Sequence, residues 1–170
     1  MITDKVYELF SKTKPQPLEV VVKKRDGFIS DYENISVENA LKDKSWHEVN
    51  INDVEVDEGY FIQYLTEESF KYYFPLIIIV GLENPLSDFA STFLTLFEKE
   101  NKILGDTIKN LNTAQQFFLI EALNVLYRER YGDDFKNIDI FHKKYCIAKE
   151  FVRKMGKKGG GLQNIDFSGE

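Results

Sequence analysis

Two residues with reactive side chains lie four positions apart near the end of the chain. If the segment is helical, His142 and Cys146 project from the same face. An imidazole and a thiolate are common zinc ligands, and together they are also part of a nucleophile and base pair. The other histidine, His47, is remote in sequence, and no orienting group can be named. We therefore expect no metal, no cofactor and no catalytic role, with Cys146 packed and His142 half exposed.

A run of carboxylates further upstream resembles a calcium-binding loop. Asp53, Glu55 and Asp57 alternate along the chain, and such oxygens can converge on a hard cation. In the calcium loop the sixth position is glycine and the twelfth is a bidentate glutamate, whereas here these positions hold Glu58 and Tyr64. The pattern therefore favours a solvated acidic surface over a calcium site.

The acidic residues are concentrated in one part of the chain. Residues 31–70, here called the acidic segment, contain eleven acidic residues and two lysines, a net charge of −9. Residues 138–155 contain five basic and two acidic residues, a net charge of +3. Opposed charges steer charged partners. We expect the acidic segment to bind a partner through Asp31, Glu33, Asp53, Glu55, Asp57 and Glu58.

The composition fits a folded chain and disfavours two classes of partner. The 170 residues are 43% hydrophobic and can bury one core. A net charge of −6 argues against binding to nucleic acid or to an anionic membrane. The longest apolar run, residues 72–82, is about half of the ~20 residues that span a bilayer. We expect neither nucleic acid nor membrane as a partner.

The single cysteine and the start of the chain predict a cytoplasmic location. Cys146 has no second cysteine with which to form an internal disulfide. Residues 1–12 include Asp4 and Glu8 and lack the basic start and apolar run of a signal peptide.

Helices must position these groups, because apolar residues recur at intervals of three and four along most of the chain. The predicted helices cover residues 2–10, 36–43, 66–81, 84–97, 112–132 and 138–155. We expect a kink or a fresh helix at Pro75, a stop near Gly81, and a loop around Gly105. Short apolar runs at residues 18–22 and 60–65 predict two strands.

The last predicted helix carries a regular apolar seam, which favours packing within the domain over packing against a second chain. The seam residues are Ile138, Phe141, Tyr145, Ala148, Val152 and Met155. The predicted fold is mainly α with a minor β element. We expect a compact single-domain bundle of five or six helices over residues 1–156, followed by a flexible tail over residues 157–170.

The middle of the chain resembles an uncharacterised family of small, mostly bacterial proteins. The shared features are Asp31 and Glu33, Trp46 after Lys44, the segment LTEESFKYYFP at residues 65–75, and a helix that opens near Gln115. The resemblance covers residues 31–131. The family usually has leucine before the proline where this chain has Phe74, so the position stays large and apolar. The resemblance implies a shared fold and assigns no catalytic residues.

The charge pattern therefore gives the first hypothesis for function: a non-catalytic protein–protein interaction module whose acidic surface binds a basic partner. An inhibitor or immunity-type protein that blocks a nuclease is one such case. The alternative is an enzyme whose carboxylates are brought together only by the fold. A third hypothesis, nucleic-acid binding through the basic last helix, is disfavoured by the net negative charge. The sequence leaves the oligomeric state open.

Overall fold

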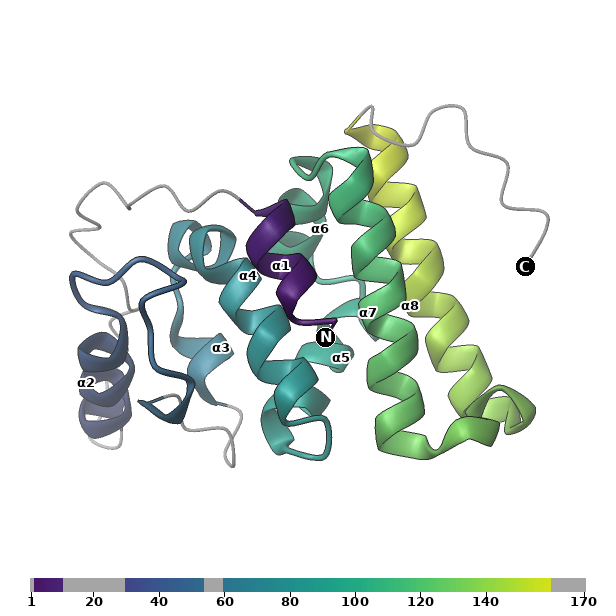
Figure 1. Ribbon diagram of the computed structural model, residues 1–170, viewed down its shortest axis with the longest axis horizontal. Coiled ribbons are helices and arrows are strands. Elements are labelled where there is room, and N and C mark those ends of the chain that lie inside the picture. The colour runs from purple at the N-terminus through teal and green to yellow at the C-terminus, as the bar shows by residue number, and fades with distance from the viewer. Residues whose placement is uncertain (1, 11–29, 54–59, 160–170) are drawn as a thin grey trace. The chain divides into compact units, whose positions relative to one another are not determined.

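A computed structural model describes residues 2–10, 30–53 and 60–159 of the chain. Within these residues the chain forms eight α-helices, two short 3₁₀ helices and no strand (Figure 1). The prediction of a mainly α fold is therefore confirmed, with more helices than the five or six that the sequence predicts. The strand predicted at residues 18–22 lies outside the described residues.

The helices belong to two compact units, Met1–Thr95 and Leu96–Glu170, which are described separately. The first unit contains α1 (Asp4–Leu9), α2 (Ser30–Leu41), η1 (Ile51–Asp53), α3 (Tyr60–Tyr64), α4 (Glu67–Glu83) and the start of α5 (Asp88–Glu98). The second contains the end of α5, α6 (Lys102–Lys109), α7 (Thr113–Tyr131), η2 (Asp133–Asn137) and α8 (Asp139–Lys158). The single domain over residues 1–156 stays a prediction.

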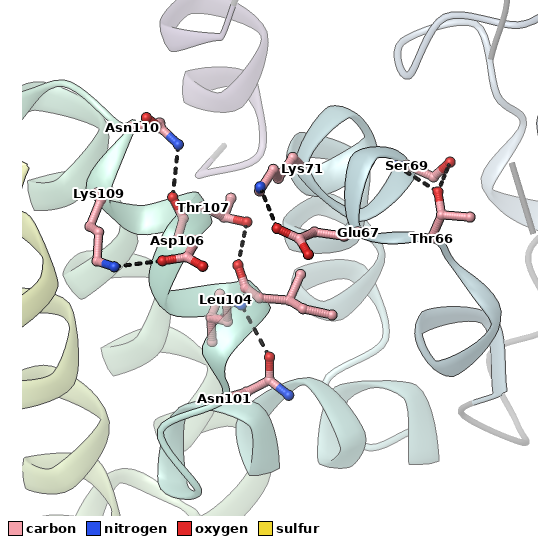
Figure 2. A network of polar contacts seen from close by, with 11 residues as sticks. Thr66, Glu67, Ser69, Lys71, Asn101, Leu104, Asp106, Thr107, Lys109 and Asn110 are labelled. Carbon is pink, nitrogen blue, oxygen red and sulfur yellow. Dashed lines mark hydrogen bonds and ion pairs between the residues drawn. The ribbon is translucent and has the colours of Figure 1, made fainter. Parts of the chain in front are cut away.

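Helix α4 begins as its sequence predicts. The hydroxyl oxygen of Thr66 accepts a hydrogen bond of 3.1 Å from the backbone N–H of Ser69, which would otherwise have no partner in the first turn (Figure 2). One turn in, Lys71 forms an ion pair of 2.7 Å with Glu67 (Figure 2). The cap and the carboxylate in the first turn together fix the start of this helix.

The same helix is longer than predicted. It continues through Pro75 and Gly81 to Glu83, so a fresh helix at Pro75 and a stop at Gly81 are wrong. Proline removes one hydrogen bond from the ladder, but residues 73–81 are all buried, and burial of their apolar surface offsets that loss. None of the helices in the described ranges has both the length and the apolar character that a membrane span requires.

The position of Asn84 before Pro85 predicts that it begins the next helix. In the structure it instead ends α4. Its backbone N–H and its side-chain amide both donate to the carbonyl oxygen of Val80, at 3.0 Å and 3.2 Å. The start of α5 is capped by Ser87, whose hydroxyl oxygen accepts from the N–H of Ala90 at 3.2 Å. The predicted helix of residues 84–97 therefore exists but starts four residues later.

Residues 60–65 are predicted to be a buried strand but form helix α3 up to Tyr64. Phe61, Ile62, Tyr64 and Leu65 are buried and Gln63 is exposed. A short apolar run of this kind fits a buried strand and a buried helix equally well, so the pattern could not separate them.

Helix α2 also starts earlier than its sequence predicts. It spans Ser30–Leu41, so Ser36 lies inside the helix and is not its cap. Val37 and Leu41 share a buried face, as their spacing predicts. Trp46 follows the helix and is 2% exposed, which confirms its place in the core.

The second unit contains one helix that the sequence does not predict. Residues around Gly105, predicted to be a loop, form α6, and Asn101 caps it by accepting from the N–H of Leu104 at 3.1 Å (Figure 2). Helix α7 has the predicted capping box, in which the side chains of Asn112 and Gln115 each accept from the other's backbone N–H.

Helix α8 packs against α6 and α7, and it runs beside α7 in the opposite direction (Figure 1). Packing of the predicted seam within its own unit is confirmed for most of its length, whereas Ile138 at the start is 42% exposed. Lys157 and Lys158 belong to α8, so the predicted tail starts two residues too early. The buried seam residues are Tyr145, Ala148, Val152 and Met155.

Candidate functional site

The six residues predicted to bind a partner have three different outcomes. Asp31 and Glu33 lie in helix α2. Asp53 lies in η1, where its side chain is exposed. The other three, Glu55, Asp57 and Glu58, lie outside the described residues. Of these six residues, only Asp53 has a described side chain. The site is therefore described through Asp53 and the other described carboxylates of the acidic segment.

Every carboxylate of the acidic segment whose side chain is described faces solvent. These exposed residues are Glu38, Asp43, Glu48, Asp53, Glu67 and Glu68. Carboxylates at the surface present negative charge to the solvent. The described part of the acidic segment is therefore suited to electrostatic recognition.

A buried tyrosine holds the turn that follows α2. The hydroxyl of Tyr73 lies 3.1 Å from the carbonyl oxygen of Leu41 and 2.8 Å from that of Lys44. Burial raises the pKa of Tyr73, so the hydroxyl keeps its proton and donates to these carbonyls. Asp43 lies between Leu41 and Lys44 in the chain and has a φ of 59°, in the left-handed region that aspartate tolerates better than most residues. Helix α4 thereby fixes the backbone that carries Asp43.

The next residues are fixed by local polar contacts. Glu48 accepts from the backbone N–H of Ser45 at 2.9 Å and also from its hydroxyl. The Nζ atom of Lys44 lies 3.4 Å from the carboxylate of Asp53, and the two side chains are 36% and 46% exposed. A solvent-accessible ion pair of this kind stabilises little, so it contributes little to fixing the position of Asp53.

His142 and Cys146 lie on one face of α8, as their spacing predicts, but both are exposed. The expectation that Cys146 is packed is therefore wrong, because α8 turns its other face to the core. The Nδ1 atom of His142 lies 2.7 Å from the carbonyl oxygen of Lys136. Among the described residues no group of three or more His, Cys, Asp or Glu side chains could hold a metal ion.

The second unit contains a polar contact that the sequence did not indicate. Glu98 accepts from the hydroxyl of Tyr127 at 2.9 Å and pairs with Lys144 at 3.1 Å. Burial, and then the charge of Glu98, raise the pKa of Tyr127. Tyr127 is fully buried against Phe135 and Tyr145, with ring centroids 5.9 Å and 5.6 Å away. This contact anchors α8 to the end of α5 within the second unit.

Helix α8 also exposes apolar side chains at the edge of its buried seam. Ile140 is 59% exposed and Ile147 is 37% exposed. They are seven residues apart, so they lie two turns apart on one side of the helix. The sequence already indicates that these two isoleucines are exposed, because both fall outside the apolar seam predicted for this helix.

Comparison of the chain with protein-family models, with curated proteins and with solved structures finds no match.

Proposed function

We propose that this protein is a non-catalytic protein–protein interaction module whose acidic segment binds a basic partner protein. An inhibitor or immunity-type protein that covers the cationic site of a nuclease is one form that such a module takes. The observation that carries the proposal is the exposure of all six described carboxylates of the segment, at Glu38, Asp43, Glu48, Asp53, Glu67 and Glu68.

The division of charge along the chain supports the same proposal. Residues 1–95 contain 17 acidic and 9 basic residues, a net charge of −8, whereas residues 96–170 contain 11 acidic and 13 basic residues, a net charge of +2. A field of one sign raises the association rate with an oppositely charged partner and repels partners of like charge.

The rigidity of the turn after α2 also supports it. Asp43 lies on backbone that the hydroxyl of Tyr73 holds by hydrogen bonds, and the side-chain carboxylate of Glu48 accepts from the backbone N–H of Ser45. A surface that is ordered before binding loses less conformational freedom on association, which favours affinity.

Charge reversal with affinity capture tests the proposal. The triple variant Asp53→Lys, Glu55→Lys, Asp57→Lys should retain at most about a tenth of the basic partner that the tagged wild-type chain captures from lysate of its own cells. A control variant with the same change of charge in the second unit, Glu121→Lys, Glu129→Lys, Glu150→Lys, should capture as much as the wild type. Equal capture by the first variant would remove the proposal.

Two related predictions accompany this function. We place the protein in the cytoplasm, and we group residues 31–131 with the uncharacterised, mostly bacterial family that they resemble. Fractionation of the cells tests the first, and alignment of residues 31–131 with members of that family tests the second. The genes beside that of this protein would show whether a basic toxin is encoded there.

A further inference from the structure

Helix α8 leaves two isoleucines exposed at the edge of its buried face. That buried face contains Tyr145, Ala148, Phe151, Val152 and Met155. Ile140 and Ile147 remain exposed at 59% and 37%, two turns apart. An isolated exposed isoleucine needs no explanation, but two at this spacing give a helix face that a partner helix can cover.

The surroundings of these isoleucines are basic. Helix α8 contains seven basic residues and two acidic ones, a net charge of +5. Lys144 and Lys154 are paired with Glu98 and Glu100 of the same unit, at 3.1 Å and 2.9 Å. Lys143, exposed and one turn from Ile140 and Ile147, forms no ion pair within the described residues. The face therefore suits an acidic helix that also presents an apolar residue.

Helix α2 has this chemistry. Ser30–Leu41 contains three acidic residues, Asp31, Glu33 and Glu38, and no basic residue. Val37, Ala40 and Leu41 are buried, whereas Ile35 is 53% exposed and Glu38, three residues on, is also exposed. Ile35 beside Glu38 on α2 therefore complements Ile140 and Ile147 beside Lys143 on α8, because apolar side chains can pack together while the opposite charges pair.

We propose that the chain associates with a second copy of itself, with the acidic helix α2 of one copy lying along the exposed face of α8 of the other. Ile35 would contact Ile140 and Ile147, and Glu38 would pair with Lys143. This inference rests on the proposed function, because it names a basic partner for the acidic segment. The contact is small, so the association is weak and depends on ionic strength.

Sedimentation velocity of the full chain measures the association directly. From about 10 µM to about 1 mM protein, the wild type should pass from monomer to larger species in about 50 mM salt and much less in about 500 mM salt. Ile140→Glu places a carboxylate opposite α2 and should weaken association at least about tenfold. Its matched control is Leu86→Glu, at a residue that is 72% exposed in the first unit, and association should be unchanged.

Mixing two defective variants tests the geometry. Glu38→Lys alters only α2 and Ile140→Glu alters only α8, so each alone should associate weakly. In an equimolar mixture, the unaltered α2 of the Ile140→Glu chain meets the unaltered α8 of the Glu38→Lys chain, and association should return. Both residues are exposed, and a circular dichroism spectrum equal to that of the wild type shows that each variant is folded.

Four results would overturn the inference. They are a wild type that stays monomeric at every concentration, variants that associate as the wild type does, a mixture that does not recover, and a monomer that instead binds phosphatidylserine vesicles through Ile140. A monomeric wild type that still captures a basic protein through Asp53, Glu55 and Asp57 removes this inference alone. Loss of both self-association and capture removes the proposed function as well.

Discussion

The hydroxyl of Tyr73 donates to the carbonyl oxygen of Lys44 at 2.8 Å, although 29 positions separate the two residues in the chain. The contact joins the first turns of α4 to the turn after α2 and so determines where Asp43 and Lys44 lie. Because Tyr73 is 1% exposed, neither water nor another donor can readily replace its hydroxyl. The position of this part of the acidic segment therefore depends on a buried side chain of another helix.

Removing that hydroxyl should destabilise the first unit. Tyr73→Phe keeps the ring and removes the hydroxyl that donates to the carbonyl oxygen of Lys44, whereas the carbonyl oxygen of Leu41 still accepts from the N–H of Lys44 at 3.1 Å. The free energy of unfolding in urea should fall by about 1–3 kcal/mol. The control is Tyr131→Phe, which keeps the stacking of that ring on Phe141 at 4.1 Å and should cost less than about 0.5 kcal/mol. Equal stability of Tyr73→Phe and the wild type would show that this hydrogen bond does not hold the turn.

Two caps of this fold could be predicted from sequence, whereas the caps at Ser87 and Asn101 could not, although they also bind the backbone N–H three positions on. Thr66 before Ser69, and Asn112 before Gln115, cap their helices as predicted. Asn84 was assigned to the wrong helix, because an asparagine can cap either end and only the tertiary path of the chain decides. Local rules therefore indicate that a cap lies near a helix boundary, whereas the fold decides which polar residue serves as the cap.

The contacts that position the candidate site could not be predicted in the same way. The pairs of Tyr73 with Lys44 and of Glu98 with Tyr127 join residues 29 positions apart, and no periodic pattern indicates which tyrosine meets which carbonyl or carboxylate. The acidic character of residues 31–70 was visible in the sequence, but the exposure of each carboxylate required the structure.

Stability should fall in alkaline solution in a way that depends on Tyr127. Burial, and then the charge of Glu98, raise its pKa above the ordinary value of 10.0, so the folded chain keeps a proton that the unfolded chain loses. This contribution is fully present below pH 10 and is lost as the pH rises, by up to about 1.4 kcal/mol per pH unit.

Urea titrations from about pH 8 to about pH 11 measure this dependence, and Tyr127→Phe supplies the comparison. The free energy of unfolding of the variant should fall less steeply with pH than that of the wild type, because one of the tyrosines that resist ionisation is gone. Lysines titrate in the same range, so only the difference between the two slopes is informative. Identical slopes would contradict the buried, protonated state of Tyr127.

The thiol of Cys146 should react without unfolding of the chain. Because Cys146 lies on the exposed side of α8, iodoacetamide should modify it in the native protein at a rate within about tenfold of that in urea. Mass spectrometry reports a single modified site, since the chain has one cysteine. A native rate slower by several orders of magnitude, measured at a protein concentration at which the chain is monomeric, would contradict the exposure of Cys146.

The salt dependence of binding to the captured basic partner tests the central claim most directly. The Debye length falls from about 10 Å at 0.1 M to about 3 Å at 1 M ionic strength, so screening should raise the Kd steadily as salt is added. The triple variant at Asp53, Glu55 and Asp57 should bind more weakly and show a flatter dependence. A Kd that is unchanged across this range would contradict recognition through the acidic segment.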